Sequence, residues 1–256
     1  MKHFKLTTTS RVNFMGVTLF QIKLRVDCKY GKAGTLGGWI EKEENLTDAW
    51  VYGNAEVSGD ARVYGNARVS GDARVYGNAR VYGNARVSGN ARVHGNAWVS
   101  GDARVSGDAW VYGNAWVSGN ARVSGDAWVS GNARVSGDAW VYGNARVSGN
   151  AWVSGNARVS GDARVYGNAW VSGNARVSGD AEVSGDAWET SPLQIQGSKH
   201  FVNESKKGCL QIGCKSLTLK EWEASFETVG KSQGYSEKQI KEYGLYIKLA
   251  IDLSEL

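Results

Sequence analysis

One six-residue phrase repeats along most of this chain, and it constrains the fold more than any other feature. Residues 63–74 read VYGNARVSGDAR, and near-copies follow one another from 49 to 188. From Ala to the Ser or Tyr after Val, each copy alternates small, large, apolar and polar residues, which is the period of a β-strand. Gly followed by Asn or Asp tolerates the positive φ of a tight corner. Each copy therefore predicts one short strand and one bend.

A single copy cannot fold alone, and this explains the repetition. Burying its Val stabilises the unit by about 1.5–3 kcal/mol, whereas ordering six residues costs about 1–2 kcal/mol for each backbone unit. Stacking on copies above and below supplies the missing backbone ladders and core contacts. The array therefore predicts an all-β solenoid.

The chain divides into three predicted parts, residues 1–48, 49–188 and 189–256. In the first part, alternating residues on both sides of Met15 and Gly16 predict two strands joined by a turn. The stretch GTLGGWIEKEENL, residues 34–46, is interpreted as a Gly-rich turn and a charged patch. We expect this part to form an N-terminal β cap, because repeat proteins need capped ends.

The third part predicts a small α+β cap. LQIQG, KHFV and CLQIGC are expected to be short strands. Two capping boxes, at Thr218 and Ser236, predict two helices, the first ending at Gly230. In the last helix, an apolar side is expected to dock on the end of the array; it comprises Ile240, Tyr243, Ile247, Leu249 and Ile251.

Composition and charge exclude few functions. Thirty Lys and Arg against 25 Asp and Glu give a net charge of +5, which does not by itself demand nucleic acid. No apolar run is long enough to span a bilayer, and the first residues contain no apolar signal core. Cys28, Cys209 and Cys214 lack the spacing of a zinc site and are expected to be free thiols. We therefore expect a cytoplasmic protein without metal or cofactor.

The array resembles the hexapeptide-repeat, left-handed β-helix family with the trimeric LpxA-like fold, over residues 49–188. The resemblance implies the left hand and three hexapeptides in each triangular coil, hence about 7–8 coils. LGGWIEKEENL before the array and IGCKSLTLKEW after it resemble the flanks of prophage-type and YdcK-like bacterial hexapeptide-repeat proteins. The trimer of that fold is not carried over, and association of copies stays open.

With three repeats per coil, the residues before each Val form three outward columns, which define three faces. The Arg face carries Arg68, Arg86, Arg104, Arg122, Trp140, Arg158 and Arg176. The Trp face carries Arg62, Arg80, Trp98, Trp116, Arg134, Trp152, Trp170 and Trp188. The mixed face carries Glu56, Arg74, Arg92, Trp110, Trp128, Arg146, Arg164 and Glu182. The corner asparagines are expected to bond along the axis, and Tyr112, with Tyr76 and His94, to lie beside the Trp column.

Two interpretations of the columns stay open. Stacked Arg and Trp side chains can serve only stability and solubility, because cation–π attraction joins them. Four successive arginines nevertheless repel one another, and a row of exposed Trp usually meets a partner. The candidate binding residues are Arg68, Arg86, Arg104, Arg122, Trp98, Trp116, Trp152, Trp170 and Tyr112.

The leading functional hypothesis is a non-catalytic binding or scaffold protein of bacterial or prophage origin. Ladders of Arg, Trp, Tyr and Asn suit an anionic or planar partner, namely a nucleotide, a nucleic acid or an acidic protein. The prophage-type resemblance suggests a phage-encoded protein that sequesters or inhibits a host component.

The alternative hypothesis is an acyltransferase, because many hexapeptide-repeat proteins have that activity. Such enzymes use a catalytic His and a loop that projects from the coil. This array contains no inserted loop, and its single His, His94, stands where Ser or Tyr normally stands. His94 is therefore a weak catalytic candidate.

Overall fold

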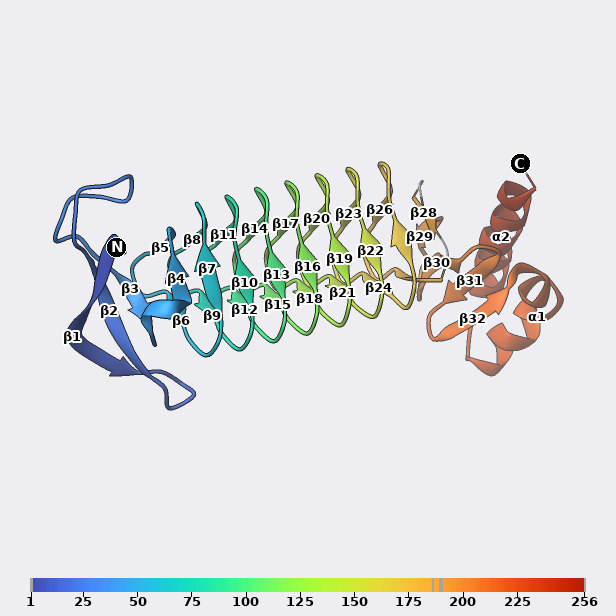
Figure 1. Cartoon of the computed structure of the whole chain (residues 1–256). Coiled ribbons are helices and arrows are strands. Elements are labelled where there is room, and N and C mark those ends of the chain that lie inside the picture. The colour runs from blue at the N-terminus through green and yellow to red at the C-terminus, as the bar shows by residue number, and fades with distance from the viewer. Residues whose placement is uncertain (1, 186, 189–190, 256) are drawn as a thin grey trace.

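The computed structural model of this chain describes residues 2–185, 187–188 and 191–255. A long array of short strands separates an N-terminal hairpin from C-terminal strands and helices (Figure 1). The array is a β-solenoid of about eight turns, and each turn contributes one strand to each of three sheets. The fold class predicted from the repeat is confirmed.

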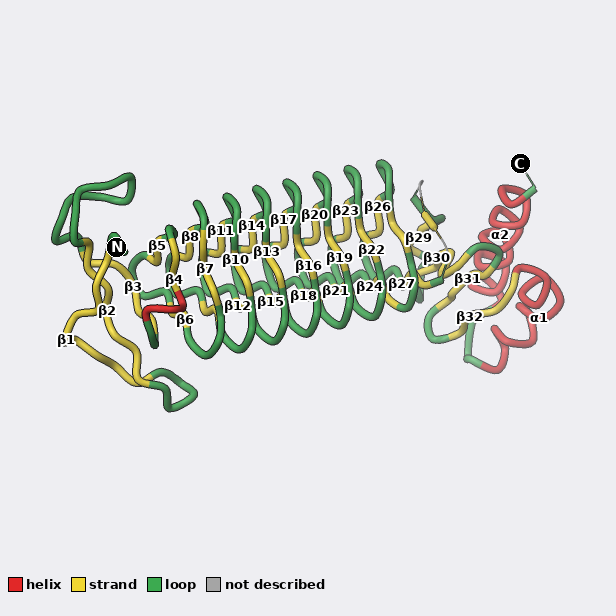
Figure 2. The backbone as a smooth tube through the Cα atoms, viewed as in Figure 1, coloured by secondary structure: helices red, strands yellow, loops and turns green. Residues whose placement is uncertain are grey.

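Each sheet corresponds to one of the three faces, and strands and corners alternate along the whole array (Figure 2). The Arg face is formed by β5 (Trp50–Val51), β8 (Arg68–Val69), β11 (Arg86–Val87), β14 (Arg104–Val105), β17 (Arg122–Val123), β20 (Trp140–Val141), β23 (Arg158–Val159) and β26 (Arg176–Val177). The Trp face is formed by β4 (Leu46–Thr47), β7 (Arg62–Tyr64), β10 (Arg80–Val81), β13 (Trp98–Val99), β16 (Trp116–Val117), β19 (Arg134–Val135), β22 (Trp152–Val153), β25 (Trp170–Val171) and β28 (Ala187–Trp188). The mixed face is formed by β6 (Glu56–Val57), β9 (Arg74–Val75), β12 (Arg92–Val93), β15 (Trp110–Val111), β18 (Trp128–Val129), β21 (Arg146–Val147), β24 (Arg164–Tyr166) and β27 (Glu182–Ser184).

The core is a continuous column of Ala and Val side chains. From Ala49 to Val183, these inward residues of the repeats are completely buried. The corners need glycine for two reasons: Gly107, for example, has φ +69°, and a Cβ there would lie 2.9 Å from the backbone N of Gly125. Backbone conformation and close approach of neighbouring coils therefore both fix the Gly of the phrase.

The N-terminal hairpin extends the mixed face. Strands β1 (Phe4–Val12) and β2 (Thr18–Leu24) pair antiparallel, and β3 (Leu36–Ile40) joins β2 to β6. The prediction of a Gly-rich turn at residues 34–38 is wrong for β3, which is followed by the 3₁₀ helix η1 (Glu43–Asn45). A Cβ on Gly37 or Gly38 would lie 2.6 Å from side chains beneath the strand. These glycines allow close packing rather than a turn.

Trp188, which the repeat places in the outward Trp column, points inward instead. Its strand pairs Ala187 with Trp170 and Trp188 with Val171, so Trp188 occupies a Val position and is buried at the end of the core. The phrase ends here, because residue 189 is Glu where the other copies have Val. The only large apolar residue left in this copy therefore takes the inward position.

Two side-chain amides protect the exposed sheet edges at this end of the array. Asn203 donates to the backbone O of Glu182 and accepts from its N–H. Gln194 donates to the backbone O of Arg176 and accepts from the N–H of Ser178. Each amide thus replaces the strand of a further coil, which removes a template for edge-to-edge association.

The C-terminal part is a four-stranded sheet with two helices. It contains β29 (Gln194–Gln196), β30 (Phe201–Lys206), β31 (Cys209–Ile212), β32 (Lys215–Thr218), α1 (Leu219–Ser232) and α2 (Glu237–Ser254). Both capping boxes are present. The predicted stop at Gly230 is wrong, because this residue lies inside α1, where a Cβ would be 2.8 Å from Ile240. Among the residues placed in the structure, no helix is long and apolar enough to cross a membrane.

The docking predicted for α2 is corrected in two respects. Its buried residues, which include Tyr243 and Ile247, pack in a cluster with α1 and the four-stranded sheet, separate from the core of the array. Leu249 does not join them, because its side chain is 44% exposed. It follows Ile247 by two residues, which is about 200° around an α-helix.

Candidate functional site

The strand register stacks the arginines of the Arg face. Arg86 lies beside Arg68 on one side and Arg104 on the other, and Arg104 lies beside Arg122. Neighbouring parallel strands are about 4.8 Å apart, and all four side chains are exposed. The column of four predicted from the sequence is therefore continuous on one surface.

A groove of about 440 Å³ follows the N-terminal half of this column. It is lined by Lys29, Tyr30, Asn66, Arg68, Asn84, Arg86, Asp102 and Arg104. The loop between β2 and β3 supplies Lys29 and Tyr30, and these two residues border the end of the groove nearest the hairpin. Lys29 donates to the side-chain O of Asn66, and the hydroxyl of Tyr30 donates to the backbone O of Asp48. The ring of Tyr30 stacks on the buried Trp50.

The groove is strongly basic and its arginines are unpaired. Four basic side chains and the single carboxylate of Asp102 give its lining a net charge of +3. Within the described part of the chain, none of Arg68, Arg86 and Arg104 forms an ion pair or stacks on an aromatic ring. At about 5 Å in water, two like charges repel by about 0.8 kcal/mol. A bound anion would relieve this repulsion at each coil.

Several arginines outside the groove have ion-pair partners. Arg74 and Arg11 both pair with Glu56, at 3.6 and 2.9 Å, and Arg164 pairs with Glu182 at 3.0 Å. These pairs lie on the mixed face, near its two ends. An outward arginine of the repeat can therefore be paired, and the groove arginines lack such partners.

The Trp face contains a closed stack, which we call the Trp-face stack: Arg80, Trp98, Trp116 and Arg134. The two indole rings are parallel with centroids 4.9 Å apart, Arg80 lies 4.9 Å from the ring of Trp98, and Arg134 lies 5.5 Å from that of Trp116. Each outer ring face is therefore covered by a guanidinium. The stack leaves ring edges, rather than ring faces, towards solvent.

Trp152 and Trp170 form a second pair on the Trp face. Their rings are parallel at 5.1 Å, and both side chains are exposed. Each indole N–H donates to a serine of the preceding coil, Ser136 for Trp152 and Ser154 for Trp170. Their polar atoms are thus satisfied within the array.

Tyr112 and His94 line the mixed face, not the Trp column. His94 stacks between Tyr76 and Tyr112 with centroid distances of 4.7 and 5.2 Å, and its ring edge meets Trp110. The expectation that this column accompanies the Trp face is wrong, because the residue after each Val contacts the outward residues of its own sheet.

His94 is half-buried in this aromatic column. Burial, with a smaller contribution from Arg92, lowers its pKa below the usual value for histidine. Its Nε2 is buried without a hydrogen-bond partner. The surroundings favour a neutral ring held by stacking, and no carboxylate of the described chain hydrogen-bonds or ion-pairs with it to orient it as a base.

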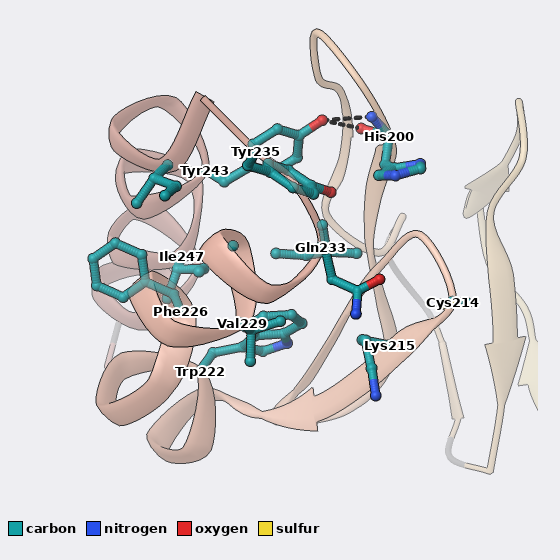
Figure 3. A pocket seen from close by; sticks show the side chains of 13 residues that line it. His200, Cys214, Lys215, Trp222, Phe226, Val229, Gln233, Tyr235, Tyr243 and Ile247 are labelled. Carbon is teal, nitrogen blue, oxygen red and sulfur yellow. Dashed lines mark hydrogen bonds between the residues drawn. The ribbon is translucent and has the colours of Figure 1, made fainter. Parts of the chain in front are cut away.

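The C-terminal part holds a small apolar cavity of about 40 Å³, shown in Figure 3. Trp222, Phe226 and Ile247 line it, and His200, Cys214 and Tyr235 stand around it. Burial raises the pKa of Tyr235 to about 12, so its hydroxyl stays protonated at neutral pH. The volume suffices for a few small atoms only.

The corner asparagines form the ladders expected from the sequence. Each side-chain amide donates to the side-chain O of the residue one coil further along, over Asn78, Asn96, Asn114, Asn132, Asn150 and Asn168. At the corner beside the groove, Asn66 donates in the same way to Asn84. The prediction of axial amide bonding is confirmed.

The structure thus distributes the predicted site residues over all three faces. Arg68, Arg86 and Arg104 meet in one groove, whereas Arg122 lies one coil beyond it and 5.1 Å from the ring of Trp140. Sequence reasoning missed Lys29 and Tyr30. No local pattern could have placed them, because their loop reaches the groove through contacts more than thirty residues away in sequence.

Comparisons with known proteins show which repeat the array is similar to. The model of the YdcK β-solenoid repeat matches residues 61–77, 73–87, 85–101, 97–113, 103–119, 115–131, 127–143, 139–155 and 157–173. A solved structure of LpxA from Acinetobacter baumannii is similar over 90% of this chain and 87% of that chain, with 11% sequence identity and a TM-score of 0.30. Among curated proteins no significant match was found.

Proposed function

We propose that the array, which matches the YdcK β-solenoid repeat over residues 61–155 and 157–173, serves as a rigid, non-catalytic scaffold that binds a polyanion along the Arg face. The ligand is a chain with a row of phosphates or carboxylates. The observation that supports this proposal is the groove of three stacked, unpaired arginines with Lys29 at its end. A guanidinium presents a planar fork of donors that suits both kinds of anion.

The spacing of the groove favours an extended ligand over a single ion. Arg68, Arg86 and Arg104 repeat once per coil, at about 4.8 Å. Three anionic groups in a row would each meet one guanidinium, and each contact would remove part of the repulsion between neighbours. Because the strand ladder fixes the backbone, the spacing of the arginines along the face is set before binding.

Recognition by charge is better supported than recognition by stacking. Single-strand binding proteins place bases on free aromatic ring faces, whereas the rings of the Trp-face stack are covered by each other and by arginines. The sequestration of a host component that the prophage-type resemblance suggests would use the same groove. The partner would then be held through its acidic surface or its phosphates.

The test compares two double charge reversals with equal change in net charge. Arg86→Glu/Arg104→Glu alters the groove, and Arg62→Glu/Arg80→Glu alters the Trp face. Binding of a labelled single-stranded oligonucleotide and of poly-glutamate is followed by fluorescence anisotropy between about 50 and 200 mM salt. We expect the groove variant to lose at least about tenfold in affinity and the Trp-face variant to lose much less.

Two results would contradict the proposal. Equal losses in both variants would show that net charge, and not the groove, carries binding. A wild-type chain that binds neither probe at low salt would remove the proposed function altogether. If only one probe binds, that result names the anion: phosphate for the oligonucleotide and carboxylate for poly-glutamate.

A further inference from the structure

A second surface, independent of the groove, lies on the outer side of α2. Leu245, Leu249 and Leu253 are exposed by 68, 44 and 48%. They follow one another at intervals of four residues, which places them along one side of the helix over about 12 Å. We call these three residues the leucine stripe.

The leucine stripe is separate from the side of α2 that holds the fold together. Tyr243 and Ile247 are buried against α1 and the four-stranded sheet, and Ile240 is buried beside Gly230 of α1. Helix α2 therefore has apolar residues on two opposite sides, which is typical of a helix that is covered on both. In Figure 1, α2 lies at the end of the molecule opposite the hairpin.

Charges beside the stripe are arranged with opposite signs at its two ends. Lys241 precedes Leu245 by one helical turn, and Asp252 follows Leu249 by three residues. Both are exposed, and Asp252 has only an exposed partner in its own helix, Lys248 at 3.4 Å. Two such helices placed antiparallel would bring opposite charges together at both ends, whereas a parallel pair would bring like charges together.

We propose that the leucine stripe is the contact of a two-fold symmetric dimer, in which α2 pairs antiparallel with α2 of a second copy. In this register Leu245 faces the partner's Leu249, and Lys241 faces the partner's Leu253, next to the partner's Asp252. Symmetry makes each contact occur twice, so one patch is complementary to itself.

A second copy fits this surface better than a membrane does. A helix that lies on anionic lipid carries basic residues along its polar side, but here the C-terminal half of the stripe is flanked by an acid. Leu253 also borders a groove of about 620 Å³ between α2 and the last coil, lined in part by Pro192, Leu193 and Leu219. The partner helix would find further apolar surface there. Because one helix pair buries a small area, we expect a weak, concentration-dependent dimer.

The experiment measures the mass of the full chain by sedimentation velocity over a range of concentrations. We expect wild type to dimerise with a Kd of about 1–100 µM, and Leu245→Glu/Leu249→Glu to raise this Kd at least about a hundredfold. Both leucines are exposed, so this variant should keep its helical circular dichroism. Lys231→Glu, a charge change at the end of α1, is the control and should leave the Kd unchanged.

Charge reversal tests the antiparallel geometry. Lys241→Glu alone or Asp252→Lys alone should weaken the dimer several-fold, because each creates two like-charge contacts. The double variant Lys241→Glu/Asp252→Lys restores opposite charges in the antiparallel arrangement and should recover the wild-type Kd within about threefold. A double variant that stays as weak as the single variants would overturn the antiparallel pairing.

Two further outcomes would overturn the proposal as a whole. The first is a wild-type chain that stays monomeric throughout the concentration range. Flotation of such a monomer with anionic vesicles would show that the stripe binds lipid instead. The second is a dimer that survives Leu245→Glu/Leu249→Glu, because the contact would then lie elsewhere. Neither outcome depends on whether the Arg groove binds a polyanion, since the two surfaces share no residue.

Discussion

The groove on the Arg face and the Trp-face stack have the same backbone and differ in one residue per repeat. Both columns occupy the position before Val in register from coil to coil. In the Trp-face stack, two arginines cover two indole rings, so each side chain of the stack has a stacking partner within the column. In the groove, three arginines stand beside one another without a partner of either kind. Nothing in the backbone explains this difference.

The comparison shows how a repeat protein separates fold from function. Inward Ala and Val with corner Gly and Asx determine the solenoid, and the outward position is free to vary. A pair of Trp between two Arg makes a column that needs no ligand, because cation–π attraction replaces cation–cation repulsion. A run of Arg alone lacks this attraction, and under the proposed function a bound anion supplies it. Substitutions that convert one column into the other can test this explanation.

The largest effect is expected when the Trp-face stack is converted into an arginine column. Trp98→Arg/Trp116→Arg removes the contact between the two indole rings, worth about 0.5–1.5 kcal/mol, and two cation–π contacts, worth about 0.5–1 kcal/mol each. It also removes the edge contact of Trp98 with Tyr82. It also adds repulsion between neighbouring arginines. We expect the free energy of unfolding at low salt to fall by about 2–4 kcal/mol, measured by urea denaturation.

Salt separates the two causes of that loss. At about 1 M salt the screening length is about 3 Å, so the part due to repulsion should be recovered while the part due to lost stacking remains. Trp98→Phe/Trp116→Phe keeps aromatic rings and serves as the control, with a smaller and salt-independent loss. An unchanged loss for the arginine variant at high salt would contradict the repulsion that the comparison assumes.

The array could be predicted from the sequence because its information is local. Six residues specify a strand and a corner, and counting in threes then places every outward residue in its column, as the register of Arg86 with Arg68 confirms. The count fails where the phrase ends. At Trp188 the missing Val frees an inward position, and burying the indole decides the register.

Only part of the candidate groove could be predicted from the sequence. Its arginines belong to the repeat, but Lys29 and Tyr30 come from a loop whose position depends on Asp48, Gly65 and Asn66. Such contacts join segments far apart in the chain and leave no periodic pattern. The sequence also could not show which side of α2 is buried. Leu249 and Ile247 are equally apolar, and only the packing of the helix shows that Ile247 is the buried one.

A smaller effect is expected when the groove column is made to resemble the stack. Arg86→Trp places a ring between Arg68 and Arg104, and two cation–π contacts should stabilise the chain by about 1–2 kcal/mol, measured as a rise in Tm. The same variant should bind the oligonucleotide or poly-glutamate more weakly, with a shallower dependence on salt. Arg86→Ala, which removes the charge without adding a ring, is the control. A variant that gains stability and keeps full affinity would show that Arg86 takes no part in binding.

The smallest effect concerns the aromatic column of the mixed face, in which His94 stacks between Tyr76 and Tyr112 and is the ring that titrates near neutral pH. Its folded pKa lies below the ordinary value of about 6.5, so the unfolded chain binds more protons as the pH falls below that value. The contribution of His94 to the free energy of unfolding is therefore fully present above about pH 6.5, and it is lost as the pH falls towards the folded pKa. His94→Tyr continues the stack between Tyr76 and Tyr112 without a group that titrates in this pH range. The urea midpoint of unfolding should therefore depend less on pH in this variant than in wild type.

Some pH dependence should remain in His94→Tyr, because burial also lowers the pKa of His3. The same variant addresses the acyltransferase hypothesis. A catalytic His94 would make acyl-CoA turnover disappear in His94→Tyr, whereas a stacked structural ring predicts a change in acid stability alone. The opposite result is acyl-CoA turnover in wild type that His94→Tyr loses, while the dependence of stability on pH stays the same in both. That result would show that the column is a catalytic site and not a structural stack.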